Sequence, residues 1–127
     1  MYKTMVNAQN APMPLARYSQ GIKVGNTLYI QGMIGLDPVT GKLVEGGIVN
    51  ETKRVFESIE AVLKEAGMGF ENVVKVVAYL SDIADYAQFN KIYNSCFETG
   101  IAPVRTTVEA KLPISARVEV EVVACET

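Results

Sequence analysis

The chain has 127 residues, with 14 acidic and 12 basic side chains, two cysteines and no histidine. Because histidine is absent, the sequence excludes a Ser-His-Asp triad, a Cys-His pair and any zinc site that needs imidazole. The net charge of −2 and the pI of about 5.2 make nucleic acid an unlikely partner, since strong binding to phosphates needs clustered lysine and arginine. Carboxylates, arginine, tyrosine, hydroxyls, amides and water must therefore supply any chemistry.

The length supports a single domain over residues 1–127, because a chain of this size buries one hydrophobic core. No apolar run is long enough to span a bilayer, and the first 14 residues lack the continuous apolar stretch of a signal peptide. Cys96 and Cys125 are too far apart for a CxxC pair, which favours two reduced thiols. We therefore expect a cytoplasmic protein that does not bind membranes.

The first regular elements are two extended stretches, from Ser19 to Val24 and from Thr27 to Gly32. They flank Gly25-Asn26, a residue pair that closes two-residue hairpins. The next turn signals lie at 37–38 and 40–41, and they predict a short returning strand over residues 42–44.

Two helices are predicted on either side of a central strand. The apolar residues between Ile48 and Ala66 form one helical stripe, which ends at Gly67. The nearly continuous apolar run from 73 to 80 predicts a strand that is covered on both faces. A second helix is expected over 83–98, with a core stripe of Tyr86, Phe89, Ile92, Tyr93, Cys96 and Phe97.

Two strands, expected over 105–112 and 117–125, close the chain. The resulting order, β-β-(β)-α-β-α-β-β, predicts an α+β two-layer sandwich with both helices on one face of the sheet. Alternation along the last two strands separates an apolar face, predicted to lie under the helices, from a polar face. The apolar set is Val108, Ala110, Leu112, Val118, Val120 and Val122, and the polar set is Arg105, Thr107, Glu109, Arg117, Glu119 and Glu121.

The polar face of the sheet is also expected to carry apolar groups. The same alternation places Val77 and Tyr79 of the central strand and Tyr29 of the hairpin on that face. A subunit contact lined with charged pairs accounts for this mixture, and we therefore expect an oligomer.

The segment 102–113, with the sequence APVRTTVEAKLP, is followed by VEVEVVA at 118–124. Further motifs are Tyr18-Ser19-Gln20-Gly21, Gly32-x-x-Gly35-x-Asp37-Pro38-x-x-Gly41 and Asn72-Val73-Val74-Lys75. Together they resemble the YjgF/Rid (RidA) family, the reactive-intermediate deaminases that are also labelled L-PSP-type endoribonucleases. The resemblance covers nearly the whole chain.

This resemblance implies a chorismate-mutase-like fold that assembles as a homotrimer, with three sites in the clefts between subunits. The implied activity is hydrolysis of 2-imino acids, such as 2-iminobutanoate and 2-iminopropanoate, to 2-oxo acids and ammonium. It implies no cofactor and no metal, and the expected ligands are small 2-imino or 2-oxo acids.

Arg105 is the first candidate catalytic residue. A guanidinium binds a carboxylate through two hydrogen bonds and stays charged at biological pH, so it can orient an imino acid but cannot be the base. On the sequence pattern alone, an ion pair with Glu109, Glu119 or Glu121 is the better interpretation. The resemblance reverses this preference, because Arg105 stands where the family's carboxylate-binding arginine stands.

Glu119 is the candidate for handling water, since a carboxylate can accept a proton as water adds to the imine carbon. Glu121 lies on the same strand face, but the resemblance assigns the family's water-holding glutamate to Glu119. For either residue, a solvated or ion-paired glutamate is the competing interpretation.

The remaining candidates are substrate-binding residues. Tyr18 matches the family tyrosine that closes the site, Asn90 can present its amide from the second helix, and Thr107 can donate a hydroxyl. Gly32 lets the backbone approach a ligand, and Gln31 precedes it where the family usually has serine. A core aromatic, ordinary structural hydrogen bonds and relief of a sheet bend are the competing interpretations.

Three functions stay open at this point. Imine hydrolysis is the first, and an endoribonuclease or translation inhibitor is the second, although the absence of histidine and the acidic pI fit RNA cleavage poorly. The third is a non-catalytic protein that binds small molecules in the same clefts. The chain departs from the family pattern at Ala16-Arg17, Gln31, Met33 and Thr107, so its substrate preference can differ.

Overall fold

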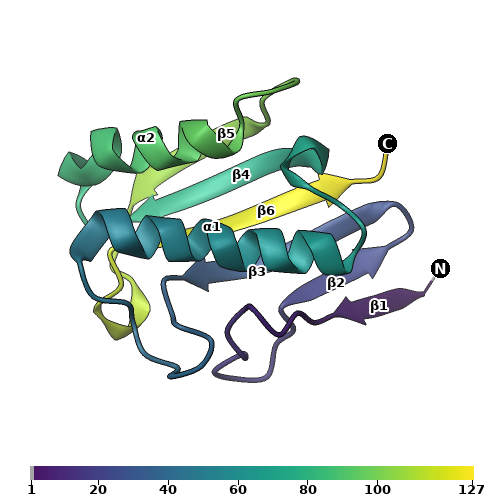
Figure 1. Cartoon of the computed structure of the whole chain (residues 1–127), viewed down its shortest axis with the longest axis horizontal. Coiled ribbons are helices and arrows are strands. Elements are labelled where there is room, and N and C mark those ends of the chain that lie inside the picture. The colour runs from purple at the N-terminus through teal and green to yellow at the C-terminus, as the bar shows by residue number, and fades with distance from the viewer. Residues whose placement is uncertain (1) are drawn as a thin grey trace.

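The computed structural model describes residues 2–127, which form a six-stranded sheet with two α-helices on one face (Figure 1). This arrangement confirms the predicted α+β two-layer fold. The sheet order is β1-β2-β3-β6-β4-β5, and every neighbouring pair is antiparallel except β4 and β5. The strands are β1 (Lys3–Val6), β2 (Gly21–Val24), β3 (Thr27–Ile34), β4 (Val73–Leu80), β5 (Val104–Glu109) and β6 (Val118–Cys125).

The hairpin of β2 and β3 is confirmed, with Val24 paired to Thr27 across the turn and Gly25 at a φ of 57°. Strand β1 was not predicted from the sequence. It has four residues, three of them exposed, and it pairs only with β2 at the edge of the sheet. The predicted strand over 42–44 is reduced to a single isolated bridge between Leu36 and Leu43, so the predicted extent is wrong.

Helix α1 (Gly47–Glu65) buries the predicted stripe, and the chain leaves the helix at Gly67, whose φ is 74°. Helix α2 (Tyr86–Cys96) starts later than predicted, because residues Ile83–Asp85 form a 3₁₀ turn capped by the Asp82 carboxylate. Phe89 and Tyr93 of α2 are buried as expected. Tyr86 is not a core residue, since 42% of its surface is exposed.

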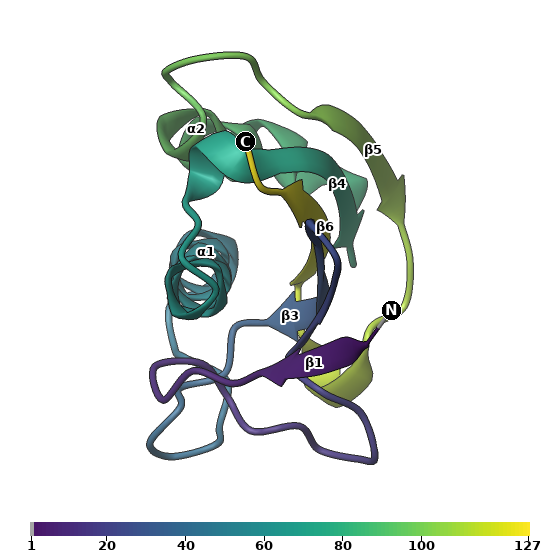
Figure 2. The same ribbon diagram turned by 90° about the vertical axis from the view of Figure 1, so that its right-hand side faces the viewer.

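The core lies between the helices and the strands β3, β4 and β6 (Figure 2). Alternate residues of β6 (Val118, Val120 and Val122) are buried on this side, as predicted. The Phe56 ring lies 6.1–6.3 Å from four further aromatic rings, those of Phe70, Phe89, Tyr93 and Phe97. This cluster fixes α1 against α2 and therefore fixes the face of α2 that overlies β5.

The predicted faces of β5 are wrong. Arg105 pairs with Val76 of β4 in a parallel register, and the Val76 side chain is fully buried under the helices. Arg105 and Thr107 therefore lie on the helix side of the sheet, whereas Val104 and Val108 are exposed on the other side. The error arose because β4 lies between β5 and β6, so alternation in β5 does not continue that of β6 directly.

Candidate functional site

Arg105 is held by three groups of α2. Its Nη1 donates to Oδ1 of Asn90 at 2.8 Å, and its Nη2 donates to the hydroxyl of Tyr86 at 2.9 Å. The guanidinium carbon lies 4.5 Å from the ring centroid of Tyr93, close enough for a cation–π contact. The guanidinium has five N–H donors, so N–H groups remain for a carboxylate after these two bonds.

The parallel pairing of β5 with β4 explains how these groups meet. The register Val76–Arg105 sets Arg105 on the helix side at the sheet edge, beside α2. Tyr86 and Asn90 are four residues apart and therefore share one face of this helix. The site is thus built by one edge strand and the first turns of one helix.

Thr107 also lies on this side of the sheet, two residues after Arg105. Its Oγ1 is buried and has no hydrogen-bond partner among residues 2–127. A buried hydroxyl without a partner costs free energy, which makes Thr107 a candidate to bind a ligand group.

Glu119 belongs to a different part of the surface. It lines a cavity of about 360 Å³ together with Tyr18, Gln31 and Gly32. Apolar side chains supply most of the remaining wall, namely Pro12, Met13, Leu15, Met33, Ile34, Leu36 and Pro113. Four of the predicted site residues therefore line one cavity.

The electrostatics of this cavity keep a proton on Glu119 more readily than on an exposed glutamate. Burial raises the pKa of the Glu119 carboxyl, and the nearby charge of Glu121 raises it further. Glu121 accepts a hydrogen bond of 2.6 Å from the hydroxyl of Tyr79. This hydrogen bond is the main cause that raises the pKa of Tyr79, and burial of the hydroxyl raises it further.

The backbone at Gly32 approaches the Glu119 carboxylate so closely that a Cβ at this position would overlap it. A larger residue at position 32 would therefore have to displace the Glu119 carboxylate. The neighbouring Gln31 has its Oε1 buried without a hydrogen-bond partner among residues 2–127. An amide oxygen without a donor, in the cavity that Glu119 also lines, suits the binding of a polar ligand or a water.

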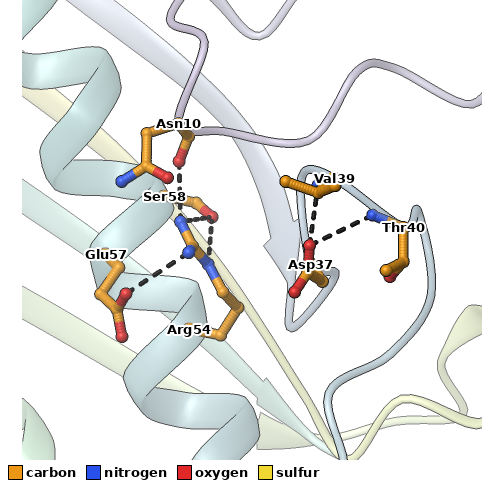
Figure 3. Close-up of polar contacts among 7 residues, drawn as sticks. All are labelled: Asn10, Asp37, Val39, Thr40, Arg54, Glu57 and Ser58. Carbon is orange, nitrogen blue, oxygen red and sulfur yellow. Dashed lines mark hydrogen bonds and ion pairs between the residues drawn. The ribbon is translucent and has the colours of Figure 1, made fainter.

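The segment that carries Tyr18 is anchored by two side chains that the sequence did not single out for this role. Gln20 is fully buried, and its amide bonds to the backbone of Ala8, Ala11 and Pro12. Arg54 of α1 donates to the backbone oxygen of Asn10 at 2.7 Å (Figure 3). These bonds hold one wall of the Glu119 cavity.

The loop after β3 is tied by its own carboxylate. Asp37 accepts hydrogen bonds from the backbone N–H groups of Val39 and Thr40 (Figure 3). These two bonds lower the pKa of Asp37. The predicted turn at 37–41 is therefore present. It begins one residue after Leu36, whose side chain lines the cavity.

The predicted site residues form two groups on opposite faces of the sheet. Arg105, Asn90 and Thr107 lie on the helix side, whereas Glu119 lies between two buried valines and points to the other side. We call these groups the arginine half-site (Tyr86, Asn90, Tyr93, Arg105 and Thr107) and the glutamate half-site (Tyr18, Gln31, Gly32 and Glu119). Within one chain the two catalytic candidates, Arg105 and Glu119, therefore do not face each other.

Tyr86 contacts Arg105 although its helical spacing had predicted a core residue, whereas Tyr93 lies in the core as predicted and also contacts Arg105. The spacing of Tyr86 four residues before Asn90 was the available signal.

Within residues 2–127 no cluster of three or more acidic or cysteine side chains could hold a metal ion. None of the helices in this part of the chain is long and apolar enough to cross a membrane.

The fold places this chain in a class of small α+β proteins with solved structures. A Yersinia pestis protein of the conserved Rid family, described as of unknown function, superposes with a TM-score of 0.95. It is 39% identical, and the match covers 98% of this chain and 100% of that one. The family described as Endoribonuclease L-PSP matches residues 8–126.

The chain belongs to the YjgF/Rid family, as the resemblance of its motifs had implied. A RutC family protein of Pyrococcus abyssi is 43% identical over 125 residues, which are 98% of each chain. The 2-iminobutanoate/2-iminopropanoate deaminase of Mus musculus is 39% identical over 125 residues, 98% of this chain and 92% of that one. Names within the family thus include both deaminases and endoribonucleases.

Proposed function

We propose that the protein hydrolyses 2-imino acids, such as 2-iminobutanoate and 2-iminopropanoate, to 2-oxo acids and ammonium. The observation that carries this proposal is the held guanidinium of Arg105, fixed by Asn90 and Tyr86 with N–H groups still free. The mouse relative that bears the deaminase name supports it.

In this mechanism Arg105 binds the substrate carboxylate, and Glu119 positions a water against the imine carbon. The substrate reacts as the iminium, so when the water oxygen bonds to that carbon the C=N electron pair moves to nitrogen, and Glu119 accepts one water proton to give a neutral carbinolamine. Glu119 passes this proton to the amine and takes up the hydroxyl proton as the C=O bond forms and the C–N bond breaks. The nitrogen leaves as ammonia, which takes the proton from Glu119 and becomes ammonium. A raised pKa makes the ionised Glu119 a stronger base than an exposed glutamate.

Because the two half-sites lie on opposite faces of one sheet, we propose that each active site joins the arginine half-site of one subunit to the glutamate half-site of a neighbour. A homotrimer provides three equivalent contacts of this kind. The face of the sheet opposite the helices supports such a contact, since Val104 (68% exposed), Val108 and Tyr29 expose apolar surface there.

The test generates the imino acid with an amino-acid dehydratase and follows its capture by semicarbazide. Because semicarbazide and the protein compete for the same imine, an active protein lowers the yield of semicarbazone. We expect the wild-type protein to lower it and Arg105→Ala to leave it unchanged. If the wild-type protein has no effect, or if Arg105→Ala acts equally well, the proposed function is wrong.

A further inference from the structure

Tyr86 occupies the open side of the arginine half-site. It is the first residue of α2, and 42% of its surface is exposed. Its ring centroid lies 5.5 Å from the guanidinium carbon of Arg105, and its hydroxyl oxygen accepts a hydrogen bond from Nη2. A ligand that reaches Arg105 from solvent therefore arrives beside this hydroxyl.

The direction of that hydrogen bond leaves a donor free. A phenol has one O–H hydrogen, and a guanidinium carries hydrogens on every nitrogen and has no acceptor. The Tyr86 hydroxyl hydrogen must therefore point away from Arg105. Because the side chain is partly exposed, this hydrogen is available to an incoming anion.

Tyr93, the other tyrosine that contacts the guanidinium, differs from Tyr86 in its exposure and in the part of the side chain that makes the contact. It is 7% exposed, and its ring rather than its hydroxyl contacts Arg105. Burial raises the pKa of Tyr93, whereas the charge of Arg105 lowers it. The buried Tyr93 therefore packs its ring against the guanidinium, whereas Tyr86 borders the space that a ligand enters.

We propose that Tyr86 is a substrate-binding residue that, with Arg105, binds one carboxylate between them. One carboxylate oxygen accepts an N–H of the guanidinium, and the other accepts the O–H of Tyr86. The role rests on the proposed function, in which Arg105 binds the substrate carboxylate. An O–H bond to a charged oxygen is among the stronger hydrogen bonds, so the tyrosine contributes to affinity rather than to the chemical step.

The direct test is Tyr86→Phe, which keeps the ring and removes only the hydroxyl. We expect the KM for 2-iminobutanoate and the inhibition constant of 2-oxobutanoate each to rise about tenfold, with kcat within about twofold of wild type. Tyr2→Phe is the matched control, because Tyr2 is 91% exposed and belongs to neither half-site. Its constants should equal those of the wild-type protein, and the melting temperatures of both variants should match it.

Two further measurements separate binding from mere support of Arg105. For the amide of 2-iminobutanoate, whose carbonyl oxygen accepts only an uncharged and weaker hydrogen bond, Tyr86→Phe should raise KM clearly less than it does for 2-iminobutanoate. In an Arg105→Lys background, Tyr86→Phe should still weaken 2-oxobutanoate inhibition, because the hydroxyl binds the ligand itself. Loss of its effect in that background would mean that Tyr86 acts only through Arg105, and the proposed contact would be wrong.

The inference and the proposed function fail in different ways. If Arg105→Ala is inactive while Tyr86→Phe keeps the wild-type inhibition constant within twofold, the role of Tyr86 is refuted and the proposed function stands. If the wild-type protein does not hydrolyse the imine, the function fails, and the role of Tyr86 that depends on it fails as well.

Discussion

The two half-sites hold opposite charges by opposite means. In the arginine half-site, Asn90, Tyr86 and the Tyr93 ring surround the guanidinium cation of Arg105. In the glutamate half-site, burial and the neighbouring charge of Glu121 raise the pKa of Glu119, so this carboxylate takes up a proton at higher pH than an exposed glutamate does. In the proposed function, the first group binds the substrate carboxylate and the second exchanges a proton with water.

The arrangement of the sheet separates these tasks. The cation is positioned by an edge strand and a helix, and the carboxylate by the central strand β6 and a loop tied down by Gln20 and Arg54. A substitution in one half-site should therefore leave the geometry of the other unchanged. Kinetic effects then report binding for the arginine half-site and proton transfer for the glutamate half-site.

The largest effect is expected at the cation. Arg105→Ala should lower kcat/KM at least about 100-fold, since it removes charged hydrogen bonds to the carboxylate and leaves Asn90 without its donor. Arg105→Lys keeps the charge but not the planar fork and should give an intermediate value. The semicarbazide competition assay measures both. Equal activity of the alanine and wild-type proteins would refute the binding role.

The second effect concerns the carboxylate. Glu119→Gln keeps the shape of the side chain but cannot accept a proton, so kcat should fall about 10- to 100-fold while KM changes little. Steady-state kinetics at pH 7 provide the measurement. A rise in KM with unchanged kcat would instead mean that Glu119 binds substrate, and the division of tasks between the half-sites would be wrong.

The third effect is a shift in pH dependence. Activity that needs ionised Glu119 should fall as pH decreases through its raised pKa. The charge of Glu121 contributes to that increase, so Glu121→Gln should move the acidic limb of the kcat/KM profile to lower pH. A profile from pH 4 to 8 on both proteins tests this. An unmoved limb would exclude coupling between the two carboxylates.

The smallest effect is on stability. Because the folded-state pKa of Glu119 lies above the ordinary value of 4.5, the folded protein binds this proton more tightly than the unfolded chain does. Stability from this group is present at low pH and is lost as pH rises through the raised pKa. Glu119→Gln should therefore melt slightly higher than wild type at pH 7 and equally at pH 3.5. A lower melting temperature at pH 7 would contradict the sign.

The hairpin, α1 and β4 could be predicted from the sequence because each has a single clear local pattern. The faces of β5 could not be predicted, since the polar side of this edge strand (Arg105, Thr107 and Glu109) lies on the helix side of the sheet, and only its parallel pairing with β4 sets Arg105 beside α2. Short β1 lacks a pattern strong enough to predict a strand. Tyr86 was misassigned because an aromatic at helical spacing usually packs in the core.

The candidate residues themselves came from the family resemblance, and the composition had already restricted the chemistry. The absence of histidine left carboxylates and arginine to act on the substrate. Neither the resemblance nor the composition could predict that Arg105 and Glu119 lie on opposite faces of the sheet, because this depends on the order of β6, β4 and β5.

The central claim is that one active site joins half-sites from two neighbouring subunits. The most direct test mixes Arg105→Ala and Glu119→Gln subunits, unfolded together and refolded as hybrid oligomers. Where an intact arginine half-site meets an intact glutamate half-site, activity should return, to roughly a quarter of the wild-type value for random mixing. Activity that stays at the mean of the two separate variants would contradict a shared site.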